Sequence, residues 1–199
     1  IFFEMPNVVW ILRNLTFWDI FYEHCSYFSP GSLTRLFAKY GFEVLRLMQA
    51  FEGQYLWLEA RPQSETRPTR VTDLDSPHKL VETIGYFAKH YQDKKATLRK
   101  LLLDNEKPNG KRAVIWGAGA KGVTILNTLE VSVEAIEFVV DINPRKQGNY
   151  IPGTGQQIVS PDFLVTYAPD TIFVMNPNYL TEIQSRIANM GLRAQLITL

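Results

Sequence analysis

The sequence predicts an α/β protein whose C-terminal half is a parallel sheet covered by helices. Apolar segments suited to strands alternate with helical segments from residue 112 to the end of the chain. A glycine-rich turn over residues 117–122 follows the first of these strands and opens a helix, as in a Rossmann-like domain. The first third of the chain predicts an antiparallel hairpin instead, with strands over residues 42–50 and 54–61.

The elements before this hairpin are short. Residues 1–5 form an apolar strand, and residues 10–15 suit a short helix. Residues 17–28 are rich in aromatic side chains and lack any period, which predicts a structured loop over a cleft. A helix over residues 33–40 follows and is closed by Gly41.

After the hairpin, the polar and proline-containing residues 62–77 mark a domain boundary. A long amphipathic helix over residues 80–102 comes next, and its basic face is typical of a solvated surface. Residues 143–160 are rich in glycine and proline and predict a loop. The remaining C-terminal segments predict four strands, 113–116, 136–140, 171–175 and 195–199, and two helices, 120–129 and 179–190. We therefore divide the chain into residues 1–62, a linker and helix over 63–109, and a Rossmann-like domain over 110–199.

Composition excludes several classes of protein. The net charge of +1 favours neither nucleic acid nor an anionic membrane as a partner. No apolar run approaches the roughly 18 residues that a membrane-spanning helix needs. Cys25 is the single cysteine, so the chain has no intramolecular disulfide and no cysteine-based zinc cluster, and we predict no metal site in it. These features fit a cytoplasmic protein.

The first residues indicate a fragment. The chain starts with Ile1, inside a strand, and has no initiator methionine, signal peptide or polar leader. We expect a larger sheet to continue upstream. A strand cut free in this way presents unpaired backbone groups, so we expect the chain to self-associate through this edge.

The glycine turn predicts a nucleotide site. Gly117 permits the tight turn, Gly119 allows a pyrophosphate to approach the backbone, and Gly122 allows the helix and strand to pack closely. Lys121 suits a phosphate, and Asp141, at the end of the next strand, suits a pair of ribose hydroxyls. Two alternatives remain open, namely glycines that only pack the domain and an NAD site. NAD is less favoured because a dinucleotide site uses about six strands and we predict four.

The loop after Asp141 lies where ligands bind in open α/β sheets. It contains Lys146, Gln147 and Tyr150, which provide a cation, an amide and an aromatic ring suited to a nucleotide. The alternative is a solvated connection without a ligand.

A second candidate site lies in the aromatic segment. His24 follows Tyr22 and Glu23, and a histidine near a carboxylate can act as a general base at neutral pH. The alternative is a structural histidine, since residues adjacent in sequence cooperate only in a loop or turn.

Several motifs, taken in order, resemble the S-adenosylmethionine-dependent sugar C-methyltransferases. That family carries Glu-Val-Pro-Asn, then Tyr-His-Glu-His followed by Ser-Tyr-Phe. The similar stretches here are Phe3-Glu4-Met5-Pro6-Asn7, Phe21-Tyr22-Glu23-His24-Cys25-Ser26-Tyr27-Phe28, Gly117-Ala118-Gly119-Ala120-Lys121-Gly122, Asp141-Ile142-Asn143-Pro144, Lys146-Gln147-Gly148, Tyr150 and Pro152-Gly153-Thr154. Phe21 and Tyr22 depart from the family's tyrosine and histidine, so the role of that first tyrosine does not carry over.

The resemblance implies the tail of a class I methyltransferase sheet followed by the family's second, Rossmann-like domain. It implies a nucleotide-linked keto-sugar as substrate, with His24 as the base, Glu23 orienting it and Tyr22 stabilising developing oxyanion charge. S-adenosylmethionine would be bound mainly upstream of this chain, and zinc only by the family's N-terminal domain, so the chain alone would be inactive. The alternatives are a non-catalytic nucleotide-sugar-binding module and an NAD-dependent oxidoreductase fragment.

Overall fold

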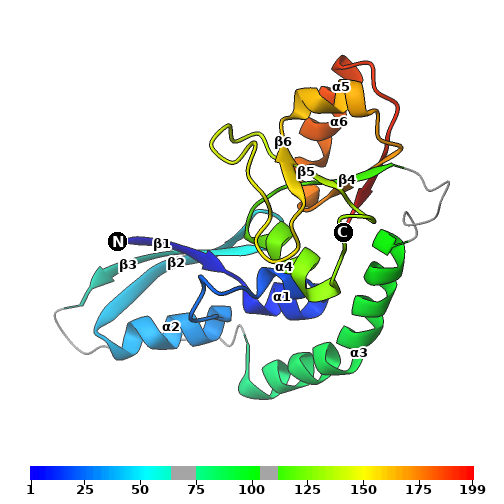
Figure 1. The fold of residues 1–199 in the computed structure, drawn as a ribbon. Coiled ribbons are helices and arrows are strands. Elements are labelled where there is room, and N and C mark those ends of the chain that lie inside the picture. Colours follow the sequence, from blue (N-terminus) through cyan, green and yellow to red (C-terminus); the bar gives the residue numbers. More distant parts are fainter. Residues whose placement is uncertain (64–74, 104–111) are drawn as a thin grey trace. The chain divides into compact units, whose positions relative to one another are not determined.

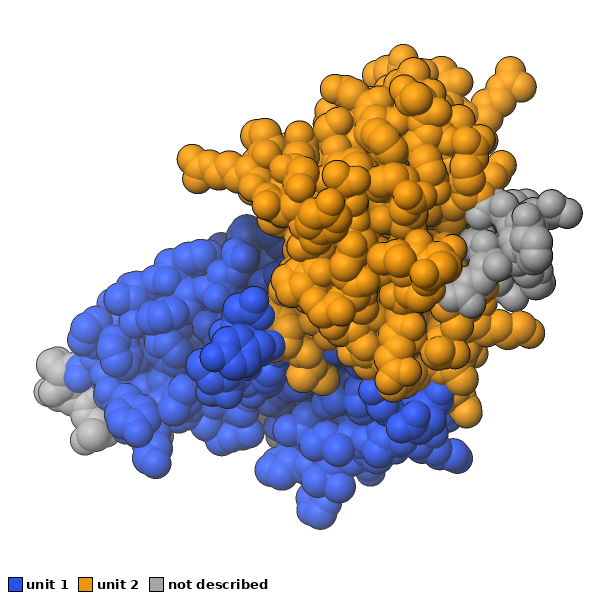
Figure 2. Space-filling view, viewed as in Figure 1, with its two compact units in different colours: residues 1–17, 22–92 blue, residues 18–21, 93–199 orange. Residues whose placement is uncertain are grey.

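A computed structural model of the chain describes residues 1–63, 75–103 and 112–199. These residues form two compact units, shown in different colours in Figure 2. Unit 1 contains residues 1–17 and 22–92, and unit 2 contains residues 18–21 and 93–199. The predicted linker lies partly outside the described residues, at positions 64–74 and 104–111.

Unit 1 is built on a three-stranded antiparallel sheet in the order β1-β3-β2 (Figure 1). The strands are β1, Phe2–Pro6; β2, Phe42–Ala50; and β3, Tyr55–Pro62. The predicted hairpin is confirmed, because β2 pairs with β3 in antiparallel register with Leu47 opposite Leu58. Its turn places Phe51, Glu52 and Gly53 at positive φ.

Two helices accompany this sheet. Helix α1 spans Val8–Asn14, and the Asn7 side chain accepts a hydrogen bond from the Val9 N–H at its start. Helix α2 spans Pro30–Lys39, and Ser29 and Ser32 form a reciprocal capping box at its start. Leu33 of α2 is buried in the apolar cluster of the sheet, which contains Leu56, Leu58 and Ala60.

Strand β1 lies at an edge of this sheet and pairs with β3 alone among the described strands. Ile1, Phe2 and Phe3 are 56%, 55% and 43% exposed. We expect the chain to associate through this edge at concentrations of ~10–100 μM, as measured by light scattering, because an unpaired apolar edge pairs readily with another strand. The variant Phe2→Lys/Phe3→Lys should be monomeric, and a wild-type chain that is already monomeric would refute the prediction.

The predicted long helix is present as α3, Pro77–Leu103. The two units divide it between Gln92 and Asp93. Its C-terminal part buries Leu98 and Leu102, whereas Ile84 in its N-terminal part is 48% exposed. Among the described helices, α3 included, none has the length and apolar character needed to cross a membrane.

Unit 2 contains a five-stranded parallel sheet in the order β6-β5-β4-β7-β8. The strands are β4, Ala113–Trp116; β5, Phe138–Val140; β6, Gln157–Val159; β7, Thr171–Val174; and β8, Gln195–Thr198. Numbered from β4 along the chain, this order is 3-2-1-4-5, the order of a Rossmann-like sheet. The predicted fold class is therefore confirmed.

The predicted count of four strands is wrong because β6 lies inside the segment 143–160, which was predicted to be a loop. This strand has three residues and follows Gly153 and Gly155, so neither its length nor its flanks resemble a strand in the sequence. It forms because Ile158 and Val159 become buried against β5.

Helices cover both faces of the sheet in Figure 1, with α4 on one face and α5 and α6 on the other. Their bounds are α4, Ala120–Leu129; α5, Leu164–Tyr167; and α6, Leu180–Asn189. Ile183 and Ile187 of α6 pack in one apolar cluster with Val114 of β4 and Val174 of β7. The sheet is therefore a rigid base for the loops at its edges.

Candidate functional site in unit 2

The strand order reverses direction at β4, so a crevice is expected beyond the carboxyl ends of β4 and β7. The glycine turn lies there. Gly117 has a φ of +127°, which side-chain-bearing residues rarely adopt, and its N–H donates to the Val140 carbonyl over 2.8 Å. A Cβ at Gly122 would overlap the Gly117 carbonyl oxygen, whereas one at Gly119 would meet nothing within 4 Å. Gly122 thus serves packing, and Gly119 leaves open space beside the start of α4.

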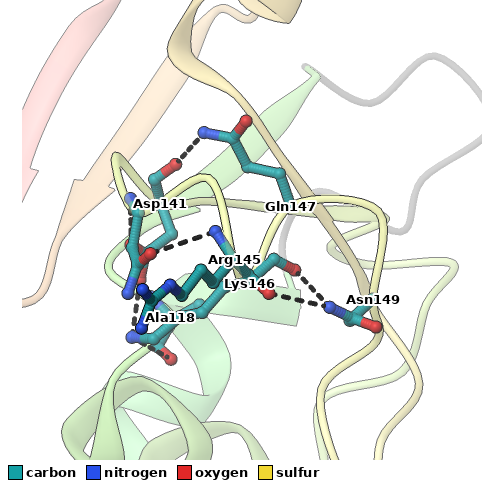
Figure 3. Close-up of polar contacts among 7 residues, drawn as sticks. Ala118, Asp141, Arg145, Lys146, Gln147 and Asn149 are labelled. Atoms are coloured by element: carbon teal, nitrogen blue, oxygen red, sulfur yellow. Dashed lines mark hydrogen bonds and ion pairs between the residues drawn. The ribbon is translucent and has the colours of Figure 1, made fainter.

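Asp141, expected to face a ribose, uses its carboxylate on groups of the protein itself (Figure 3). One oxygen accepts from the Ala118 N–H at 3.1 Å and from the Lys146 Nζ at 3.0 Å. The other accepts from the Asn143 N–H at 2.8 Å. Because Lys146 Nζ also donates to the Ala118 carbonyl at 3.1 Å, this carboxylate and ammonium lock the glycine turn onto the following loop.

Gln147 continues this network, since its Nε2 donates to the Asp141 carbonyl at 2.9 Å. The structure therefore brings Gly117, Asp141, Lys146 and Gln147 together at one edge of the sheet. Lys146 keeps one N–H beyond its two contacts, because an ammonium has three donors.

Tyr150 lies elsewhere. It forms a bridge with Gln157, the first residue of β6. This places Tyr150 at the amino ends of the parallel strands, whereas the glycine turn lies at their carboxyl ends. There it lines a cavity of about 550 Å³ together with Arg112, Glu137 and Tyr167. Burial, followed by the nearby Glu137 carboxylate, raises the pKa of Tyr167. The structure thus places Tyr150 away from the glycine turn.

Lys121 is held by an acidic residue from far away in the sequence. Its Nζ lies 2.7 Å from Oδ1 of Asp19, and the two side chains are only 17% and 11% exposed. Asp19 belongs to the four-residue stretch 18–21, which is part of unit 2. The sequence offered no signal for this pair, because 102 positions separate the two residues and no single motif contains both.

The predicted catalytic motif lies in an irregular part of unit 1. Residues 20–27 form no helix or strand in the described structure. The His24 ring packs edge-on against Tyr27, with 5.9 Å between ring centroids, and its Nδ1 is shielded from solvent. Glu23 is exposed, and Tyr22 is 98% exposed. His24 therefore has a defined local setting, whereas Tyr22 points into solvent.

Sequence analysis also missed a polar turn at the end of β7. The residues Asn176, Pro177 and Asn178 come one residue after this strand, which pairs with β4 in the sheet. The Asn178 N–H donates to the Asn176 side chain at 3.1 Å, and Asn178 Nδ2 is buried without a hydrogen-bond partner among the described residues. The available signal was an Asn-Pro-Asn turn after the mostly apolar segment Thr171–Met175.

Strand order, a glycine turn at the point of reversal and a polar loop after β5 together define a Rossmann-like α/β domain. Comparison with known proteins identifies the family. Residues 64–198 match the C-methyltransferase C-terminal domain, so the chain belongs to the C-methyltransferase family.

The chain is also similar to C-methyltransferase NovU from Streptomyces niveus. The two are 32% identical over 190 residues, which cover 92% of this chain and 45% of that protein. The chain therefore spans less than half the length of this relative. The similarity includes unit 1 as well as unit 2, and it confirms the predicted family.

Proposed function

We propose that this chain is the C-terminal part of an S-adenosylmethionine-dependent C-methyltransferase that acts on a nucleotide-linked keto-sugar. The observation that carries the proposal is the glycine turn locked to Asp141 and Lys146 at the switch point of a Rossmann-like sheet. Such an edge suits a nucleotide diphosphate, because the first turn of α4 presents backbone N–H groups beside the open side of Gly119.

The chemical step we propose uses the motif in unit 1. His24 removes a proton from the carbon next to the sugar ketone, and Glu23 orients its ring. The resulting enolate carbon takes the methyl group, and a hydrogen-bond donor stabilises the charge on the enolate oxygen. We assign that donor role to Tyr22, which requires its exposed phenol to contact bound substrate.

S-adenosylmethionine supplies the methyl group when bound, but the described residues of unit 1 do not fit it. Methyl donors of this kind need a glycine-rich turn after a strand, and the glycines of unit 1 lie instead after α2, in the hairpin turn or within α2 and α3. The glycine turn after β4 in unit 2 is the one that we assign to the nucleotide diphosphate. We therefore propose that another part of the full-length enzyme binds the donor. Calorimetry should detect no micromolar binding of S-adenosylmethionine to the 199-residue chain, and such binding would overturn this assignment.

Lys146→Ala should weaken binding of thymidine diphosphate by about ten- to a hundredfold. The variant removes an ammonium from the turn and leaves the Asp141 carboxylate uncompensated, so a diphosphate meets an extra negative charge. Calorimetry on the full-length enzyme would measure this. Adding Asp141→Asn to the variant should recover part of the affinity.

Arg145→Ala is the matched control, because Arg145 is an exposed neighbour that contacts the loop through its backbone. Its N–H donates to Asn143 Oδ1, and its carbonyl accepts from Asn149 Nδ2. It should change the affinity less than threefold or so. Equal affinity of Lys146→Ala and the wild type would place the nucleotide off this edge. Tighter binding of NAD than of thymidine diphosphate would favour an oxidoreductase fragment instead.

A further inference from the structure

The ion pair between Asp19 and Lys121 takes no part in the chemistry proposed above. Lys121 belongs to the glycine turn, and Asp19 precedes the Glu23-His24 motif in the sequence. The chain leaves unit 1 after Phe17, contributes residues 18–21 to unit 2, and returns to unit 1 at Tyr22. The stretch that belongs to unit 2 therefore ends shortly before the Glu23-His24 motif.

The contacts of this stretch are those of a fixed segment. Trp18 is 2% exposed, and the Lys94 ammonium lies 5.7 Å from the centroid of its ring. Asp19 is 8% exposed and approaches Lys121 Nζ to 2.7 Å. A buried aromatic ring and a shielded ion pair thus hold two adjacent residues in unit 2.

The position of Lys121 in helix α4 makes the Asp19 carboxylate a favourable counter-ion. Lys121 is the second residue of α4, where the helix dipole disfavours a cation and favours an anion. The Asp19 carboxylate compensates the ammonium and itself lies beside the start of the helix. Removing Asp19 alone would leave a largely buried positive charge without its counter-ion.

The segment that carries His24 is attached at both ends. His24 comes five residues after Asp19, so the intervening chain spans at most about 17 Å. At the other end, Phe28 forms a bridge with Asn7 in unit 1, and its carbonyl accepts from the Val8 N–H at 3.1 Å. Between these two attachments lie the irregular residues 20–27.

We propose that Asp19 and Lys121 are positioning residues, whose ion pair fixes in unit 2 the start of the segment that carries Glu23 and His24. The proposal rests on the proposed function, since it assigns His24 to the proton transfer. A base displaced by about 1 Å loses much of its efficiency. The pair therefore acts on turnover and leaves nucleotide affinity unchanged.

The test uses Asp19→Asn in the full-length enzyme, with Glu43→Gln as matched control. Glu43 forms an ion pair of similar length with Arg61, 2.8 Å, but both side chains are well exposed. For Asp19→Asn we expect kcat to fall about 10- to 100-fold with KM within about threefold of the wild type. Hydrogen exchange of residues 17–28 should become faster in the same variant. The control should change neither quantity.

If Asp19→Asn does not fold, the double variant Asp19→Asn/Lys121→Met takes its place in every measurement. The second substitution removes the ammonium whose counter-ion has been lost. Both variants should lose the same factor in kcat, because the two residues act as one unit. Unchanged exchange, unchanged kcat, or tighter nucleotide binding after loss of Asp19 would overturn the proposal. If the wild-type enzyme transferred no methyl group, the proposed function would be rejected. Faster exchange in Asp19→Asn would then still support the role of the ion pair in attaching this segment to unit 2.

Discussion

Replacing His24 with asparagine in the full-length enzyme is expected to lower kcat by about 10²–10⁴-fold, the usual loss of a general base. Asparagine keeps a polar side chain of similar reach but cannot accept the proton from the substrate carbon. Because the change leaves the glycine turn of unit 2 intact, the dissociation constant of the nucleotide-sugar should stay within about threefold. Steady-state kinetics and calorimetry on the same preparation would measure both.

The control is the same substitution at His78, which is exposed in the first turn of α3. It should leave kcat unchanged. A kcat for His24→Asn within a factor of about three of the wild type would make His24 a structural residue of the loop.

The sequence was sufficient for the elements whose signals are local. Alternation of apolar strands with helices predicted β4, α4 and β7, and the glycine after residue 40 predicted the end of α2. Strand β6 and helix α5 escaped because they have three and four residues, too few for any period to show. They form because their apolar side chains are buried, and Val159 and Leu164 belong to the central apolar cluster of unit 2.

The site divides in the same way. The spacing of the glycines predicted which of them packs and which leaves space, because that spacing follows from the strand–turn–helix geometry itself. The hydrogen-bond and ion-pair partners of the charged residues could not be predicted from the sequence. Asp141 has the expected position but bonds to Ala118 and Lys146, and Lys121 bonds to a residue near the start of the chain. Tertiary contacts of this kind leave no periodic trace in the sequence.

Alanine substitutions at Gly122 and Gly119 test two different roles of the glycine turn. The first tests its packing, and the second tests ligand binding. At Gly122 an alanine Cβ would overlap the Gly117 carbonyl oxygen, and this oxygen is fixed because Gly117 also bonds to Val140. We expect Gly122→Ala to destabilise unit 2 by about 1–3 kcal/mol. For a domain of this size, each kcal/mol lowers the melting temperature by about 4–8 °C, so scanning calorimetry on the full-length enzyme should show a clear shift.

Gly119→Ala should have the opposite profile. A Cβ at this position would meet nothing within 4 Å, and φ is −87°, which alanine adopts without strain. The free energy of unfolding should therefore change by no more than about 0.5 kcal/mol, and the melting temperature by a few degrees at most. The added methyl group would nevertheless occupy the open side of the turn, where we place the diphosphate, and affinity for thymidine diphosphate should fall by about tenfold or more. If Gly119→Ala bound the nucleotide as tightly as the wild type, the glycine turn would serve only to pack α4 against the sheet, because the space that it leaves open would have no ligand to admit.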